Sequence, residues 1–312
     1  MIVVAGEALV DLVPDAAGAL RPHPGGGPFN TARTIARLGP PVAFLGRLSS
    51  DRFGHELEKL LDDDGVALDA LVRTDEPTTL ALAELDDAGA ARYRFYERGT
   101  SAAGLRPAEA LAALPGSVDA LHVGTLGIHL EPVATAIEAL VDRLPGDALL
   151  AVDPNVRPGV LADPAAFRAR LARLMERADL LKLSEDDLAW LAPGAAPEKG
   201  VRLLLGSAGA GVLTRGGAGA LAVTRDAAVE VPAPRVDVVD TIGAGDAFGG
   251  GLLAWWAMHD LGRDGVASVD ALREATRFAC QVAALTCARA GASPPSLAEV
   301  QAASAARGAR TP

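Results

Sequence analysis

Short apolar segments of strand type alternate with segments of helical spacing along most of this 312-residue chain. Such strand-like segments are ALHVGTL (120–126), ALLAVDPN (148–155), DLLKLS (179–184) and RLLLGS (202–207), and helix-like segments such as PVATAIEALVDRL (132–144) lie between them. Strands that are joined through helices run parallel in one sheet. The alternation therefore predicts an α/β fold, in which helices flank both faces of a doubly wound, mostly parallel sheet.

Residues 72–98 break this alternation. They read as two strands joined by DDAGA (86–90), and residues 12–22 supply another strand. We expect these segments to form a small antiparallel β lid, and the core domain to comprise the remaining residues, 1–11, 23–71 and 99–312. Because a thin lid buries little apolar surface alone, a homodimer formed through the lid is one expectation, with a monomer as the alternative.

Charge and cysteine content narrow the classes of function. The net charge of −11 argues against nucleic acid or an anionic membrane as the main partner. Cys280 and Cys287 are the two cysteines, which fits a reducing compartment and excludes a disulfide framework. The first residues carry Glu7 and Asp11, unlike a signal peptide, and no run reaches the ~18–20 apolar residues of a membrane span. We therefore expect a soluble cytoplasmic protein.

The segment VDVVDTIGAGDAFGGGLLAWW (236–256) places five glycines between a strand-like run and a helix-like run. Each glycine inside a helix costs about 1 kcal/mol relative to alanine, so something must compensate. A helix N-terminus presents free N–H groups, and the bare backbone of residues 243–245 would let an anion approach them. Asp246 is then either a helix cap or a base that accepts a proton from a hydroxyl attacking a bound phosphate. The triplet 249–251 would allow close packing of the helix on the sheet.

Two segments resemble the signatures of the ribokinase, or PfkB, family of sugar kinases. DTIGAGDAFGGGLL (240–253) is similar to its C-terminal signature, and PGGGPFNTARTIARLG (24–39) is similar to its N-terminal one. The lid also falls where the family has one, and the resemblance covers essentially the whole chain. It implies a ribokinase-like fold and transfer of the γ-phosphoryl group of MgATP to a sugar hydroxyl. Asp246 would be the base, and Gly243, Ala244 and Gly245 would donate N–H bonds to the phosphoryl group.

The resemblance also assigns residues to the acceptor sugar. The residues implied near its hydroxyls are Asp11, Gly25, Gly26, Gly27 and Asn30. A solvated turn residue is the alternative for Asp11, and a residue that merely starts a helix is the alternative for Asn30. On the lid we expect Arg94, Tyr96 and Arg98 at the sugar, although strand alternation leaves open whether this face or that of Tyr93 and Phe95 looks inward.

DPNVRPGVL (153–161) is similar to the D-x-N-x-R segment of fructokinase-like and 2-keto-3-deoxygluconate-kinase-like members. Asn155 and Arg157 would then lie at the substrate, at the carboxyl end of a strand. An ion pair between Arg157 and Asp153 is the alternative reading.

For the nucleotide, KLSEDDL (182–188) matches the position of the family's N-x-x-E motif, with Ser184 and Asp187 replacing its Asn and Glu. Asp187 would hold Mg²⁺ through water, but a helix cap explains the same residues. The implied nucleotide-binding set is Lys182, Ser184, Gly206, Ser207, Gly209, Gly245 and Cys280. Leu204 stands where the family often has Thr, two residues before a glycine. Asp240 and Ile242 lie where some members bind K⁺, which leaves a K⁺ site open.

These assignments predict an ATP-dependent carbohydrate kinase with Mg²⁺ as the cofactor. Fructose, converted to fructose 6-phosphate, is the acceptor that the D-x-N-x-R segment, Ser184 and FYERGTSA (95–102) most resemble. Keto-deoxygluconate, ribose and a nucleoside are the alternatives within the family. A non-catalytic sugar- or nucleotide-binding protein is the alternative of another class, and retention of Asp246 argues against it. A dinucleotide oxidoreductase is disfavoured because GEALVDLV, without a G-x-G-x-x-G turn, follows the first strand.

Overall fold

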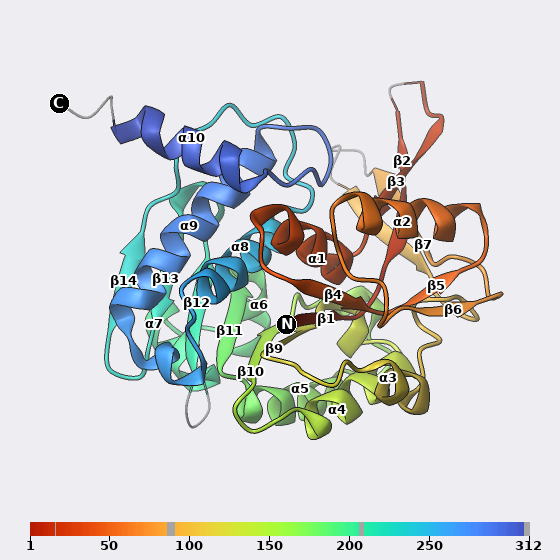
Figure 1. Ribbon diagram of the computed structural model, residues 1–312, viewed down its shortest axis with the longest axis horizontal. Coiled ribbons are helices and arrows are strands. Elements are labelled where there is room, and N and C mark those ends of the chain that lie inside the picture. The colour runs from red at the N-terminus through yellow and green to blue at the C-terminus, as the bar shows by residue number, and fades with distance from the viewer. Residues whose placement is uncertain (16, 86–90, 206–208, 309–312) are drawn as a thin grey trace.

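The structure is a computed structural model that describes residues 1–15, 17–85, 91–205 and 209–308 (Figure 1). Its centre is an eight-stranded sheet in the order β14-β13-β12-β11-β10-β9-β1-β4. The parallel strands are β1 (Ile2–Ala5), β4 (Val42–Leu45), β9 (Ala120–Gly124), β10 (Leu149–Asp153), β11 (Leu180–Ser184) and β12 (Ala210–Thr214). The antiparallel strands β13 (Ala220–Val223) and β14 (Ala228–Val231) extend one edge. The predicted mostly parallel sheet is confirmed.

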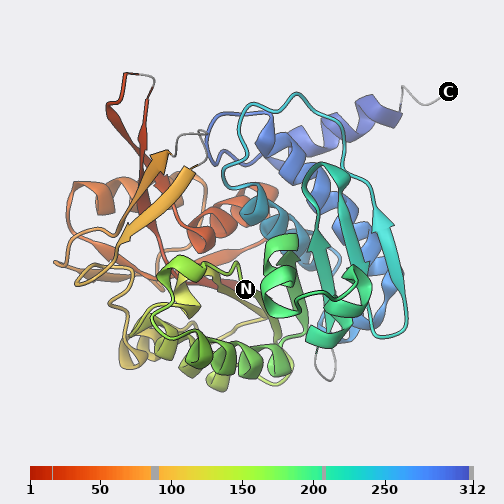
Figure 2. The ribbon, with the colours of Figure 1, turned by 180° about the vertical axis from the view of Figure 1, so that it is seen from behind.

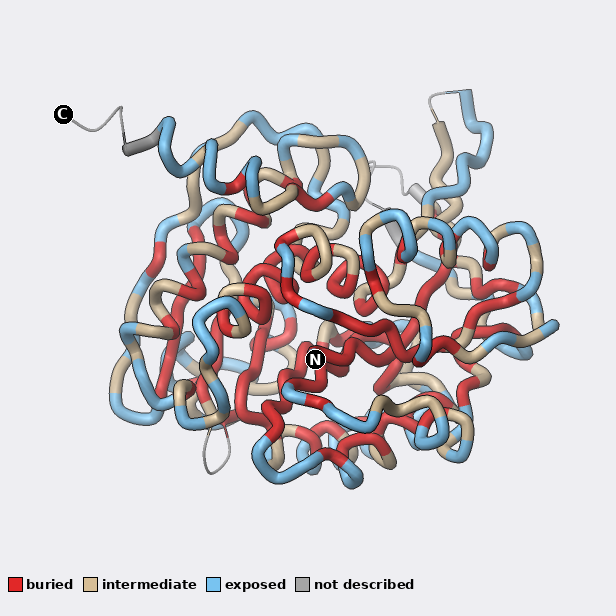
Figure 3. Tube along the Cα trace, in the orientation of Figure 1, coloured by how far each residue is buried: buried red, intermediate tan, exposed pale blue. Residues whose placement is uncertain are grey.

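Helices cover both faces of this sheet (Figures 1 and 2). One face packs against α1 (Gly27–Leu38), α2 (Arg52–Asp63), α8 (Ala244–Met258) and α9 (Val269–Cys287). The other face packs against α3 (Pro107–Ala113), α4 (Val133–Arg143), α5 (Pro164–Arg177), α6 (Glu185–Leu191) and α7 (Pro197–Leu204). Successive residues of a strand point to opposite faces, so Val3 enters one core and Val4 the other. The buried trace in Figure 3 follows these central strands.

Two predicted strands are wrong. RLLLGS begins within α7, where Pro197 starts the helix and Val201 and Leu205 are buried one turn apart. Four apolar residues in a row fit a buried helix as well as a strand, which explains the error. VDVVD (236–240) is irregular chain after β14, and Val238 and Val239 are exposed. The N–H groups of Val239 and Asp240 donate to the carbonyl of Cys287, so this segment is tied to the end of α9 and not to the sheet.

A second sheet projects from the core at the upper right of Figure 1. Its order is β3-β2-β7-β8, from the strands β2 (Leu9–Pro14), β3 (Leu20–Gly25), β7 (Leu80–Leu85) and β8 (Ala91–Tyr96). The β2–β3 and β7–β8 pairs are antiparallel and the central β2–β7 pair is parallel. β6 (Val72–Thr74) lies inside the predicted lid range but pairs with β5 (Arg47–Ser49) in a separate small sheet. The DDAGA turn lies outside the described residues.

Two glycines of the triplet in α8 pack against helices, not against the sheet as we expected. A Cβ atom on Gly250 would lie 2.6 Å from Cβ of Thr34 in α1, and one on Gly251 would lie 3.1 Å from Cβ of Val282 in α9. Gly249 faces open space. Helix α8 is therefore held tightly between α1 and α9, which offsets the cost of glycine and fixes the position of its N-terminus. Helix α10 (Leu297–Gly308) lies against α9 through Val300. Among the described helices none is both long and apolar enough to cross a membrane.

Candidate active site

Asp246 lies in the first turn of α8, at the carboxyl edge of the central sheet. Gly243 is the N-cap of this helix, with a φ of 74° that suits glycine, so the reading of Asp246 as a simple cap is wrong. Asn30 Nδ2 donates to Oδ2 of Asp246 at 2.9 Å, and the hydroxyl of Thr31 donates to the carbonyl of Asp246. Burial raises the pKa of Asp246, although the bond from Asn30 opposes this. A carboxylate with a raised pKa suits proton transfer near neutral pH.

A buried cation lies beside the N-terminus of α8. Lys182 Nζ donates to Asp153 Oδ2 at 2.8 Å, and a Cβ atom on Gly245 would lie 3.2 Å from this nitrogen. Burial lowers the pKa of Lys182, but the charges of Asp153 and Asp187 outweigh this and raise it. The ammonium group therefore stays charged next to the helix terminus. Asp153 pairs with Lys182, so the predicted alternative pair of Asp153 with Arg157 is wrong.

One of the three amides expected at the anion site, that of Ala244, is already bonded to the protein. The N–H of Ala244 donates to the carbonyl of Thr241 at 3.2 Å, whereas the N–H groups of Gly245 and Asp246 fall in the first helical turn, where intrahelical acceptors do not exist. Asp240 accepts bonds from the N–H of Ile242 at 3.0 Å and from that of Gly291 at 2.8 Å. Asp240 therefore ties the turn to the loop after α9 and keeps the helix terminus in place.

Asp11 and Tyr93 face this centre from the lid. Burial and the charge of Asp246 raise the pKa of Asp11 to about 7, so the two carboxylates lie in each other's field. Burial also raises the pKa of Tyr93, as do the charges of Asp11 and Asp240, which places its ring on the same side. Phe95 packs against Leu9, Ala81 and Leu126, and the ring of Tyr93 stacks beside it, so this face of β8 is turned toward the core.

The expected lid contacts are divided. Arg94, which pairs with Glu84 at 2.9 Å, and Arg98, whose side chain is 98 % exposed, line the cavity under the lid. Tyr96 is half exposed and does not line it, so the expectation for Tyr96 does not fit this geometry. Strand alternation fixed the two sets of residues but did not determine which face packs on the core.

The glycine loop 25–27 is packed against the protein itself. A Cβ atom would lie 2.3 Å from Asp11 Oδ2 at Gly25, 2.7 Å from the carbonyl oxygen of Glu7 at Gly26, and 2.5 Å from Thr125 Cγ2 at Gly27. Gly26 also has a φ of 108°, a conformation that favours glycine. These glycines let the loop approach β2 and the turn after β9, so that Asn30 reaches Asp246.

Asp187 holds the D-x-N-x-R loop and does not present a metal ligand. Its Oδ1 accepts the N–H of Val156 at 2.6 Å, its Oδ2 accepts the N–H and hydroxyl of Ser184, and it is 1 % exposed. Ser184 in turn caps α6 through the N–H of Asp187. The capping alternative is correct, and the predicted Mg²⁺ role of Asp187 does not fit this arrangement. Among the residues that the structure covers, no group of three or more His, Cys, Asp or Glu side chains could hold a metal ion.

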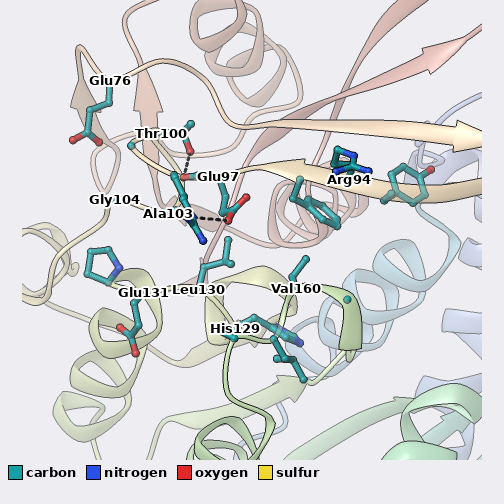
Figure 4. A pocket seen from close by; sticks show the side chains of 18 of the residues that line it. Glu76, Arg94, Glu97, Thr100, Ala103, Gly104, His129, Leu130, Glu131 and Val160 are labelled. Carbon is teal, nitrogen blue, oxygen red and sulfur yellow. Dashed lines mark hydrogen bonds and ion pairs between the residues drawn. The ribbon is translucent and has the colours of Figure 1, made fainter.

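Asn155 and Arg157 lie on the same loop, next to the centre. Asn155 has a φ of 39°, and the N–H of Arg157 donates to His129 Nε2 at 3.3 Å. The charge of Arg157 contributes to the pKa values of both Asp246 and Tyr93. A cavity of about 910 Å³ lies between the lid and the segments 129–132 and 159–162, beside this centre, and Asp246, Asn155 and Arg157 do not line it. Figure 4 shows His129, Leu130 and Val160 on its core side, with Arg94 and Glu97 on the lid side.

A second cavity, of about 790 Å³, lies on the other side of the α8 N-terminus. Ala244, Gly245 and Phe248 of α8 form one wall, and Cys280 and Cys287 of α9 form another. The remaining wall includes the turn between β12 and β13, with Thr214, Gly216, Gly217 and Gly219. Lys182 and Ser184 do not line this cavity but lie under the helix terminus and at the start of α6.

The β12–β13 turn is the part of the site that sequence reasoning missed. Gly209 lies at the amino end of β12, where a Cβ atom would meet the carbonyl oxygens of Ala178 and Asp179, so it is at the opposite edge of the sheet. Gly206 and Ser207 lie outside the described residues. The signal was nonetheless present, because Thr214 stands two residues before Gly216, the spacing that we sought at Leu204.

Comparisons with known proteins agree with this geometry. The model of the pfkB family carbohydrate kinases matches residues 1–299. The fructokinase of Rhizobium leguminosarum bv. trifolii is 36% identical over 266 residues, 84% of this chain and 81% of that protein. Fructokinase-2 of Zea mays is 34% identical over 312 residues, 94% of this chain and 90% of that protein.

Among solved structures, fructokinase with bound ATP from Xylella fastidiosa has a TM-score of 0.89 at 30% identity and covers 98% of both chains. Fructokinase from Vibrio cholerae O395 in a form with fructose, ADP and calcium ion bound has a TM-score of 0.84 at 27% identity, covering 96% of this chain and 97% of that one. The chain therefore belongs to the pfkB family of carbohydrate kinases.

Proposed function

We propose that this carbohydrate kinase phosphorylates fructose at its primary 6-hydroxyl group, with ATP as the donor. The observation that carries the proposal is the position of Asp246. It lies between Asp11 of β2 and Asn30 of α1 on one side and the cavity beyond the α8 N-terminus on the other. The proposal is also supported by the fructokinases of Rhizobium leguminosarum bv. trifolii and Zea mays, which are 36% and 34% identical to this chain. Fructose would lie on the Asp11 side and ATP in the cavity lined by Cys280 and Gly216.

The reaction that this geometry supports is a direct in-line transfer. Asp246 accepts the proton of the sugar hydroxyl while the sugar oxygen forms a bond to the γ-phosphorus, and the bond from that phosphorus to the bridging oxygen of ADP breaks. The N–H groups of Gly245 and Asp246 and the ammonium of Lys182 stabilise the charge on the phosphoryl oxygens. Such transfer needs positioning, charge stabilisation and one base more than covalent chemistry from the protein.

The test is an ATP-consumption assay over fructose, other ketoses, aldoses, sugar acids and nucleosides, with identification of the product by NMR. Fructose should give the highest kcat/KM, and phosphorus should be found on O6. A higher kcat/KM for 2-keto-3-deoxygluconate, ribose or a nucleoside would overturn the acceptor assignment. Absence of ATP turnover with every acceptor would instead overturn the assignment of Asp246 as a base.

We also propose that the nucleotide enters as MgATP, and that the loop of Asp240 and Ile242 binds K⁺. The Mg²⁺ proposal rests on the chemistry of ATP, because Asp187 is occupied by protein donors. The K⁺ proposal is supported by a fructokinase structure of Vibrio cholerae O395 described with fructose, ADP and potassium ion bound. Initial rates measured during separate titrations of Mg²⁺ and K⁺ test each ion, with Na⁺ as the control for ionic strength.

The lid division and the quaternary structure complete the proposal. The sheet of β2, β3, β7 and β8 acts as the lid on the core, to which β6 belongs, and the lid closes over fructose to exclude water. Leu20 and Tyr96 are half exposed on the two edge strands of the lid, so we propose a homodimer formed through it. Light scattering of the wild type and of Tyr96→Asp should give dimer and monomer masses, respectively. A cytoplasmic location, where ATP is available, can be tested by cell fractionation.

A further inference from the structure

Glu7 is a buried carboxylate to which the proposed reaction gives no role. It lies between β1 and β2, is 3 % exposed, and accepts three hydrogen bonds from two segments of the chain. Its Oε1 accepts the N–H of Gly27 at 3.3 Å and the hydroxyl of Thr125, and its Oε2 accepts the N–H of Gly127 at 2.9 Å. One side chain therefore joins the start of α1 to the turn after β9.

The network continues from Thr125 to the D-x-N-x-R loop. His129 Nδ1 bonds the carbonyl of Thr125, and His129 Nε2 accepts the N–H of Arg157 at 3.3 Å. Because a backbone N–H can only donate, Nε2 must accept, and the ring proton lies on Nδ1. The ring also stacks on Phe167 with centroids 4.4 Å apart, which fixes its plane. Figure 4 shows His129 at the wall of the cavity under the lid.

Both loops reached by this network contain a strained residue. Thr125 has a φ of 49° and Asn155 a φ of 39°, in the left-handed region that is costly for residues other than glycine, above all for a β-branched one. Such conformations persist where surrounding contacts determine them. At Thr125 these contacts are its hydrogen bonds with Glu7 and His129. After Asn155 they are the bonds from the N–H of Val156 to Asp187 and from the N–H of Arg157 to His129.

We infer that Glu7 is a positioning residue for the acceptor: through Thr125 and His129, it holds the 25–27 loop and the Asn155–Arg157 loop in one arrangement around Asp246. The inference rests on the proposed function, because it assigns these loops to the sugar. The described hydrogen bonds of Glu7 reach no residue that lines the cavity of Cys280 and Gly216. Loss of Glu7 should therefore weaken sugar binding and leave nucleotide binding intact.

The main variant is Glu7→Gln, which keeps the size of the side chain. Its amide nitrogen cannot accept a bond, so at least one of the three donors loses its partner. The KM for the sugar should rise about tenfold to a hundredfold, as expected for an unpaired buried donor, while the KM for ATP stays within about twofold. The dissociation constants of sugar and ATP, measured by calorimetry, should show the same split.

The matched control is Asp179→Asn. Asp179 is 2 % exposed and accepts the N–H of Leu150 at 2.8 Å, but it lies at the amino edge of the sheet and pairs with Arg177 and Arg263. This variant should lower the thermal midpoint and leave the KM for the sugar unchanged. If Glu7→Gln raises both KM values together, or lowers only the thermal midpoint as the control does, Glu7 is merely structural.

A second pair of variants covers the case in which Glu7→Gln does not fold. Thr125→Val keeps the branched shape and removes the hydroxyl that bonds Glu7, whereas Thr125→Ser keeps the hydroxyl. The KM for the sugar should rise in the first and return toward the wild-type value in the second, and equal values would contradict the inference. The acceptor used is the one that the wild type phosphorylates best. A sugar other than fructose would therefore overturn the proposed acceptor and still allow this test.

Discussion

Asn30 Nδ2 lies 2.9 Å from Asp246 Oδ2, a hydrogen bond between residues 216 positions apart in the chain. It joins the first turns of α1 and α8, the two helices that the two signature segments begin. The bond fixes the orientation of the carboxylate and favours its ionised form. The proposed base and the start of α1, which is proposed to bind the sugar, are therefore held relative to each other in the absence of substrate.

Replacement of Asp246 by Asn should remove the base and preserve the shape of the site. We expect kcat to fall about 10²–10⁴-fold, the range for general base catalysis, with a much smaller change in the KM for fructose. Steady-state kinetics at saturating ATP measure both values. Asp186→Asn, an exposed acid in the first turn of α6, is the control and should retain wild-type rates. Near-normal turnover of Asp246→Asn would show that another group takes the proton.

Replacement of Asn30 by Ala should shift the pH profile of kcat. The bond from Asn30 lowers the pKa of Asp246, so its loss raises that pKa further. Because the base must be ionised, the acid limb of kcat should move to higher pH, and activity should be lost sooner on acidification. Rates between pH 5 and 9 at saturating fructose test this. An unchanged acid limb with a lower plateau would mean that Asn30 acts on the sugar alone.

Alanine at two adjacent glycines of α8 should have opposite effects on stability. Gly250→Ala places a methyl group 2.6 Å from Cβ of Thr34, and overpacking of this kind costs about 1–3 kcal/mol. Gly249→Ala meets open space and should stabilise the helix by up to about 1 kcal/mol. Urea unfolding of the two variants measures the difference. Equal free energies of unfolding would contradict the tight packing of α8 on α1.

Asp11→Asn should change how stability depends on pH. The pKa of Asp11 rises from 3.8 to about 7 in the folded protein, so the folded state binds more protons than the unfolded state between these values. The contribution of Asp11 to stability is therefore present below pH 3.8 and is lost as the pH rises through about 7. Relative to wild type, Asp11→Asn should gain up to about 2–3 kcal/mol between pH 5 and 7.5. Thermal unfolding at both pH values measures this, and parallel curves would contradict it.

The sequence predicts the layers of the fold well, because alternation of strand and helix leaves few other arrangements. It fails where an apolar run has two readings. RLLLGS fits a buried helix as well as a strand. The exposed Val238 and Val239 lie in an irregular segment beside a cavity and pair with no strand. The same ambiguity hid the turn at Thr214, since a false strand at 202–207 took the place of the true one, Ala210–Thr214.

The position of a side chain could be predicted where one short segment supplies both the side chain and the helix start that holds it, as at Asp246 and Asn30. It is not predictable where partners come from distant segments. Glu7 takes donors from residues 20, 118 and 120 positions away, and nothing in its own neighbourhood marks it. The residue type of Asp187 fits either a metal ligand or a cap, and the bond from the N–H of Val156, a residue 31 positions away, decides between them. Strand alternation likewise sorted the lid residues into two faces without telling which one is inside.

The short link Gly6–Ala8 joins β1 of the core to β2 of the lid, and the strand β3 returns to the core through the loop at 25–27. The first connection contains Glu7, whose side chain accepts the N–H of Gly27 at the end of the second. Gly26 of the second connection also lies close to the carbonyl oxygen of Glu7. These contacts hold both connections in place, so neither can act as a hinge. Any swing of the lid has to be taken up by the connections into β7 and out of β8. The lid is thus built like a flap that is fixed along one margin, and substrates would enter from the margin that is free.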